Sequence, residues 1–193
     1  MWTLVNPLYD VEDIVNLADD NYGSEIDGVI SRDREVFRYR LTVAATEQIF
    51  NLSKEFLAVF RKSENYCVTH ETENSGTITY VPSKLLGFCW FDRGGYTTYS
   101  NEEISNAKFH HVDLSLPAKQ RVRLINEMID QHVLWANNYN IPIICSTSIR
   151  GEHDGFMRIH KKRGFTVNGS YAWIRTEEGM KCLMNQSRKQ EPL

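Results

Sequence analysis

The order of three segments in the second half of the chain constrains the fold most strongly. Residues 108–116 alternate between two faces in the manner of a strand. Pro117 ends this strand and suits the first turn of a helix, whose apolar residues recur every three or four positions as far as Ala136. Residues 142–148 then follow as a buried strand. A strand, a long helix and a second strand predict a sheet covered by helices.

The first third of the chain is predicted to be mainly helical. Residues 1–6 form a short strand, and Asp10 is the expected N-cap of a helix with apolar residues at helical spacing. Good helix formers fill residues 35–46, and one apolar stripe continues over residues 49–62, so a further helix or a helical extension is predicted there. The polar residues 21–33, which include two glycines, predict a loop.

Strands are predicted from residue 66 onward, where β-branched and aromatic residues dominate. The predicted strands before the central helix are residues 66–72, 77–81 and 85–91. Residues 92–95, with the sequence Asp-Arg-Gly-Gly, predict a turn. Near the C-terminal end, residues 155–163 predict a short helix and residues 165–175 a last strand.

The length of 193 residues and the hydrophobic content of 41% favour one folded domain and exclude a disordered chain. We therefore predict an α/β (α+β) fold in a single domain over residues 1–176, with a mixed central sheet and helices on both faces. Residues 177–193 are a predicted polar tail. The apolar runs are far shorter than the roughly 18 residues that span a bilayer. We expect a cytoplasmic protein without membrane contact.

Charge is distributed unevenly along the chain. Residues 1–100 carry 9 basic and 15 acidic side chains, whereas residues 101–193 carry 13 basic and 10 acidic ones. This asymmetry excludes a uniformly basic nucleic-acid binder but permits a local site for an anion in the C-terminal half. Lys119, Arg121 and Arg123 crowd the start of the long helix, where free N–H groups and the helix dipole also favour an anion. The plain alternative is that these side chains simply project into solvent.

Metal binding is not expected. The four cysteines lie far apart and form no Cys-x-x-Cys pair, so they predict reduced thiols rather than zinc ligands or disulfides. His110 and His111 are adjacent on a predicted strand and point to opposite faces. They are therefore unsuited to hold one metal ion together.

The chain resembles the Gcn5-related N-acetyltransferase superfamily in the succession of residues 109–116, 117–138, 141–148 and 153–165. The pair Gly164-Phe165 closes a short helix as in that family, with His160 where a tyrosine often stands. In that family the first two elements hold acetyl-coenzyme A, so the resemblance implies acetyl-coenzyme A as cosubstrate. The residues that it places at the coenzyme are Leu114, Ser115, Leu116, Lys119, Gln120, Arg121, Val122 and Arg123.

The chain departs from the family pattern in the loop that wraps the pyrophosphate, where the family has Gln/Arg-x-x-Gly-x-Gly/Ala. Arg123 and Ile125, or Leu124 and Asn126 in the other frame, stand at the small positions, and larger side chains can block close backbone approach. Two alternatives to an acetyltransferase therefore stay open. One is a non-catalytic binding or structural protein, similar to divergent copies found in tailed phages. The other is a protein that binds nucleic-acid phosphates through its basic C-terminal half.

Acyl transfer to an amine needs a base for the ammonium and an acid for the leaving thiolate. His111 and Asp113 lie two residues apart on one predicted strand face, and together they are the candidate general base. The resemblance places His160 at the general acid. A polar strand face and a surface histidine are the plain alternatives. The acceptor amine, on a small molecule or a protein, is expected to enter between residues 21–33 and residues 168–171.

Overall fold

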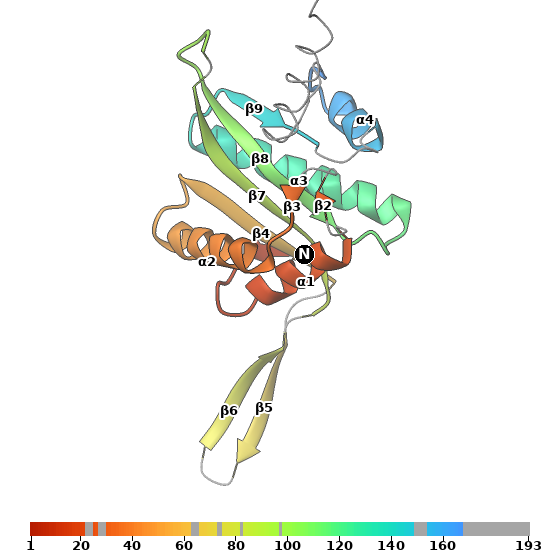
Figure 1. The fold of residues 1–193 in the computed structure, drawn as a ribbon. Helices are drawn as coiled ribbons and strands as arrows, with labels where there is room; N and C mark the ends of the chain where they lie inside the picture. Colours follow the sequence, from red (N-terminus) through yellow and green to blue (C-terminus); the bar gives the residue numbers. More distant parts are fainter. Residues whose placement is uncertain are drawn as a thin grey trace, which may run out of the picture. The chain divides into compact units, whose positions relative to one another are not determined.

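The computed structural model describes residues 1–21, 25–26, 30–62, 66–72, 75–81, 83–96, 98–148 and 154–167. The chain divides into two compact units, Met1–Gly23 with Asp33–Ser148 and Ser24–Arg32 with Ile149–Leu193. The described residues of the first unit form a mixed five-stranded sheet with helices (Figure 1). The predicted α/β class is confirmed. The predicted polar tail, residues 177–193, lies outside the described residues.

The central sheet has the strand order β1-β4-β7-β8-β9. Its strands are β1 (Trp2–Leu4), β4 (Glu55–Arg61), β7 (Leu85–Tyr96), β8 (Glu103–Val112) and β9 (Ile143–Ser146). The first four strands pair antiparallel, whereas β9 runs parallel to β8. This parallel pair depends on helix α3 (Ala118–Asn138), because parallel neighbours need a crossover connection of about a dozen residues or more.

Helices cover both faces of the sheet, as predicted. Helices α1 (Val11–Asn21) and α2 (Arg34–Phe50) lie on one face and α3 lies on the other (Figure 1). Leu57 of β4 belongs to the same buried cluster as Ile14 of α1. Its neighbour Phe56 faces Trp135 of α3, with ring centroids 6.5 Å apart. Successive strand residues point to opposite faces, so both faces of the sheet are core.

The helix predicted over residues 49–62 is wrong. Helix α2 ends at Phe50, Asn51 is its C-cap, and the chain continues as strand β4. All residues of β4 after Glu55 are buried, because the strand lies between β1 and β7 with helices on both sides. A strand that is buried on both faces loses the alternation of apolar and polar residues by which strands are recognised.

Residues 92–95 do not form the predicted turn. They belong to β7, which extends to Tyr96 and pairs with β8 along this stretch. The register shifts between Arg93 and Tyr96, and Gly95 has a φ of 82°. The two glycines therefore mark an irregularity within a strand, where a positive φ is tolerated, rather than a reversal of the chain.

Shorter elements complete the described chain. The predicted loop over residues 21–33 contains the paired strands β2 (Glu25–Ile26) and β3 (Ile30–Ser31). The predicted strands over residues 66–72 and 77–81 are confirmed as β5 (Tyr66–Thr72) and β6 (Ser75–Val81), which pair with each other.

The predicted C-terminal helix is confirmed as α4 (Asp154–Lys162) in the second unit. No strand begins at residues 165–167, and the rest of the last predicted strand lies outside the described residues. Within the described ranges, no helix has the length and apolar character needed to cross a membrane.

A buried ion pair joins β4 to α1. Arg61 Nη2 lies 2.6 Å from Asp10 Oδ1 and 2.8 Å from Asp13 Oδ2. Arg61 Nη1 donates to the carbonyl oxygen of Ser83 at 2.5 Å, and the backbone N–H of Asn6 donates to Asp10 Oδ2 at 2.7 Å. The expected helix-capping residue Asp10 therefore directly precedes α1 while its carboxylate binds the guanidinium of the neighbouring strand.

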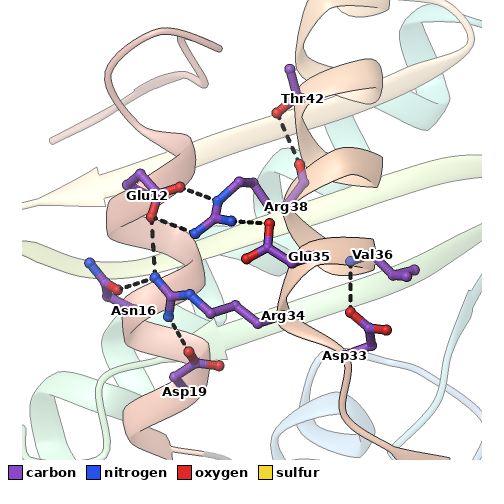
Figure 2. Close-up of polar contacts among 9 residues, drawn as sticks. All are labelled: Glu12, Asn16, Asp19, Asp33, Arg34, Glu35, Val36, Arg38 and Thr42. Carbon is purple, nitrogen blue, oxygen red and sulfur yellow. Dashed lines mark hydrogen bonds and ion pairs between the residues drawn. The ribbon is translucent and has the colours of Figure 1, made fainter.

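A second polar network joins α1 to α2 at the surface. Figure 2 shows Arg34 between Asp19 and Asn16, and Arg38 between Glu12 and Glu35. The acidic partners lie mainly on α1 and the arginines on α2. The Glu12 side chain is 54% exposed, so solvent screens these pairs and they contribute little to stability individually.

Candidate functional site

The central sheet opens between β8 and β9. Pairing runs from Ile104 with Ile143 to Ala107 with Ser146, and β8 then continues to Val112. Trp90 of β7 pairs with Phe109 and the next residue pairs with Ala107, so Lys108 is an extra residue in β8. Such a bulge bends its strand, and this one lies directly after the last described pair with β9. Among the described residues, the part of β8 after Ala107 has no β9 partner, and we call this stretch the opening between β8 and β9.

Backbone groups of β8 face this opening. The backbone N–H of Asp113 donates to the Leu86 carbonyl oxygen at 2.9 Å, on the β7 side. Successive N–H groups of a strand point to opposite edges, so those of His110 and Val112 point away from β7. In the described part of β9, pairing reaches only as far as Ala107. Beyond its last pair with β9, this edge of β8 carries backbone groups of the kind that pair with an extended chain.

The start of α3 lies directly beyond the end of β8. Its N-cap residue is Pro117, which provides no side-chain hydrogen bond, and the first turn contains no acidic residue. Arg123 Nε pairs with Glu127 at 2.9 Å and its side chain is 80% exposed. By contrast, Arg121 Nε is buried and has no hydrogen-bond acceptor among the described residues. A helix start without a side-chain cap, followed within its first turns by an arginine whose Nε has no acceptor among the described residues, favours an anion.

The residues predicted to bind coenzyme lie in two places. Leu114, Ser115 and Leu116 form the turn between β8 and α3, because β8 ends at Val112 and not at Leu116 as predicted. The turn is closed by the backbone N–H of Leu116, which donates to the Asp113 carbonyl oxygen. The other predicted residues, Lys119, Gln120, Arg121, Val122 and Arg123, are in the first two turns of α3.

His111 and Asp113 are two residues apart in the chain, but their side chains have different partners in the structure. His111 is buried, and its Nε2 lies 3.2 Å from the Asn21 amide nitrogen. Asp113 Oδ2 pairs with Lys84 Nζ at 2.9 Å, and Asp113 Oδ1 accepts from the Ser115 N–H at 2.8 Å. Burial opposes ionisation of Asp113, but the bonds to Ser115 and Lys84 outweigh it and lower the pKa of the carboxyl. A lower pKa makes Asp113 a weaker base.

His160 is buried in the second unit between two phenylalanines. Its ring centroid lies 4.3 Å from that of Phe156 and 5.0 Å from that of Phe165. Burial lowers the pKa of His160, although a hydrogen bond at 3.0 Å between Nδ1 and the Phe156 carbonyl oxygen opposes this effect. A carbonyl only accepts, so Nδ1 carries the proton. The neutral form then has no proton on Nε2, which does not favour the predicted role as an acid.

The lowered pKa of His160 predicts a loss of stability in acid. As the pH falls below about 6.5, the unfolded chain binds a proton at this histidine before the folded chain does. The contribution of neutral His160 is therefore present above this pH and is lost progressively below it. The free energy of unfolding, measured at pH 7.5 and 5.5, should fall less in His160→Phe than in the unaltered chain. An equal fall in both proteins would show that His160 does not carry this effect.

Two polar contacts at the end of β8 were not predicted from the sequence. Asn21 binds His111 and Lys84 binds Asp113, across 90 and 29 positions of the chain. No local pattern indicates such pairs, because they depend on how α1 and β7 lie against β8. A third unpredicted contact joins Ser105 Oγ to His132 Nε2 at 2.5 Å, in the core under α3.

The predicted orientation of the two adjacent histidines is confirmed. His110 contacts the Phe91 ring on the α3 side, whereas His111 contacts Phe88 on the side of α1. The two adjacent histidines thus point to opposite faces. Burial raises the pKa of the Cys89 and Cys145 thiols, which keeps both protonated.

Comparison with solved structures identifies the fold. A probable acetyltransferase superposes with a TM-score of 0.60 at 11% identity, over 91% of this chain and 95% of that chain. A ribosomal-protein-alanine N-acetyltransferase from Brucella melitensis biovar Abortus 2308 gives 0.56 at 12% identity, over 91% and 98%. The fold is that of the Gcn5-related N-acetyltransferases.

Another matching solved structure is described as a transcriptional regulator. A transcriptional regulator from Bacillus halodurans C-125 gives a TM-score of 0.58 at 15% identity, over 91% of this chain and 98% of that chain. No family model and no curated protein matches the sequence. The likeness therefore establishes the fold, and the function has to be argued from the site.

Proposed function

We propose that the chain transfers an acetyl group from acetyl-coenzyme A to an amine. The observation that carries this proposal is the opening between β8 and β9, which lies beside the uncapped, basic start of α3. An opening lined by backbone N–H and C=O groups suits the amide-rich arm of a coenzyme, and the helix start suits its phosphates. The acetyltransferases among the structures of this fold support the same function.

The residues at the helix start are compatible with the coenzyme although the family's glycines are missing. Leu124 and Ile125 are buried against the sheet, and Asn126 Nδ2 donates back to the Val122 carbonyl oxygen at 2.8 Å. These larger side chains are thus held away from the free N–H groups of the first turn. Arg121, with the N–H groups of Ala118 and Lys119, would hold the pyrophosphate. When bound, acetyl-coenzyme A supplies the acyl thioester.

The proposed chemistry relies mainly on positioning and on backbone polarisation. The amine nitrogen attacks the acyl carbon, the carbon–sulfur bond breaks, and the proton that the amine loses ends on the thiol of the leaving coenzyme. The backbone N–H of Val112, which points away from β7, can stabilise negative charge on the acyl oxygen. The roles of His111, Asp113 and His160 in proton transfer stay predictions. Asp113, with its lowered pKa, remains ionised and is better suited to attract the acceptor's ammonium than to deprotonate it.

Calorimetry and thermal unfolding with acetyl-coenzyme A test this proposal. Ligand at 100 times its dissociation constant should stabilise the fold by roughly 2.7 kcal/mol, seen as a higher unfolding temperature. Transfer is then measured as free thiol released in the presence of a peptide α-amine or an aminosugar. Binding without release for any amine would indicate the non-catalytic alternative. No stabilisation at millimolar ligand, together with salt-sensitive DNA binding, would instead indicate a nucleic-acid ligand.

A further inference from the structure

The side chain of Asn21 joins the end of α1 to the end of β8. Its Nδ2 lies 2.7 Å from the Leu17 carbonyl oxygen, and its Oδ1 lies 3.0 Å from the backbone nitrogen of Leu114. The same Nδ2 lies 3.2 Å from His111 Nε2. One amide therefore contacts the helix, the turn after the strand, and a buried histidine.

The two backbone contacts determine which way the amide is oriented. The Leu114 N–H can only donate, so the atom facing it must be the amide oxygen. The Leu17 carbonyl can only accept, so the atom facing it must be the amide nitrogen. A flipped amide would place two donors together at Leu114 and two acceptors together at Leu17. The orientation follows from hydrogen-bond chemistry at both contacts.

We infer that Asn21 holds His111 as a neutral imidazole with its proton on Nδ1. The amide nitrogen has two hydrogens, of which one is bonded to the Leu17 carbonyl oxygen. The other points toward His111 and requires an acceptor, so Nε2 must present its lone pair. The neutral ring has a single N–H, which is then at Nδ1.

Asn21 is therefore a positioning residue for His111. With Nε2 bonded to Asn21, the nitrogen that could take a proton from an acceptor amine is already occupied, and His111 acts through Nδ1 as a donor. This consequence for catalysis rests on the proposed function, whereas the position of the proton does not. Asn21 also accepts from the Leu114 N–H, so it fixes the turn that leads from β8 to α3.

Two-bond nitrogen–proton NMR correlations of the ¹⁵N-labelled chain test the inference directly. The pattern of couplings to the ring protons distinguishes the Nδ1–H form from the Nε2–H form. His111 is assigned from the signal that disappears in His111→Gln. At a pH where the ring is neutral, the unaltered protein should show His111 in the Nδ1–H form. The Nε2–H form, or an equal mixture of both forms, would overturn the inference.

Asn21→Asp provides a second test, with Asn16→Asp as its matched control. A carboxylate cannot donate to Nε2, so this nitrogen should become protonated in Asn21→Asp and the couplings should change accordingly. Asn16 lies on the same helix and accepts from Arg34 at 2.7 Å, a bond that an aspartate keeps, so Asn16→Asp should leave the His111 signals unaltered. An unchanged Nδ1–H form in a folded Asn21→Asp would contradict the positioning role.

These measurements need no coenzyme and no acceptor. If His111 has the expected form but acetyl-coenzyme A does not bind, the proposed function fails and the inference stands. If acetyl-coenzyme A binds and His111 is in the Nε2–H form, the inference fails and the proposed function stands. If Asn21→Asp does not fold, the spectrum of the unaltered chain still decides the question.

Discussion

Arg61→Met should lower the free energy of unfolding by about 3–5 kcal/mol, the loss typical when one partner of a buried ion pair is removed. The side chains of Arg61 and Asp10 are only 4% and 5% exposed. Without the guanidinium, the Asp10 carboxylate would stay in the interior with no cation beside it. Urea unfolding measures the effect as a lower midpoint at unchanged slope.

Two further variants isolate the buried charge as the cause. Arg38→Met removes an arginine from the exposed network of Figure 2 and should lower the free energy of unfolding far less, because solvent screens its ion pairs. Asp10→Asn, combined with Arg61→Met, should recover part of the loss, because an amide can accept from the Asn6 N–H without being charged. Equal losses in Arg61→Met and Arg38→Met, or no recovery in the double variant, would show that the buried charge is not the cause.

The sequence predicted the elements that have a clear periodicity or a marked end of their own. Periodicity and Pro117 predict helix α3 and its flanking strands, and the sequence of residues 155–163 predicts the short helix α4. Strand β4 was missed because its residues 56–60 are all apolar, since each face of the strand packs against a different helix. An apolar run of that length fits a helix equally well.

The candidate site also combines features that the local sequence predicts with features that depend on packing. The basic first turn of α3 could be predicted, since Lys119, Arg121 and Arg123 are close in the chain. The partners of His111 could not, because a hydrogen bond between side chains 90 residues apart depends on packing that leaves no local pattern. The bulge at Lys108 was also missed, because an extra residue in a strand is defined only by its neighbour's register.

Arg121→Glu should weaken the binding of acetyl-coenzyme A by roughly 100-fold. Loss of a hydrogen bond to a charged group costs about 1.5–3 kcal/mol, and each 1.4 kcal/mol corresponds to about tenfold in affinity. The carboxylate also places a negative charge beside the phosphates. Arg121 should be the most sensitive position, because its Nε has no acceptor among the described residues. Calorimetric titration of the folded variant measures the change.

Two charge reversals of the same kind serve as controls. Arg123→Glu should weaken binding only a few-fold, since its guanidinium is 80% exposed and already bound to Glu127. Arg40→Glu, on the exposed side of α2, should leave the affinity unaltered. If all three variants lose affinity equally, long-range charge rather than a defined site attracts the coenzyme. If Arg121→Glu binds as tightly as the unaltered chain, the pyrophosphate lies elsewhere, and the start of α3 has no role in holding it.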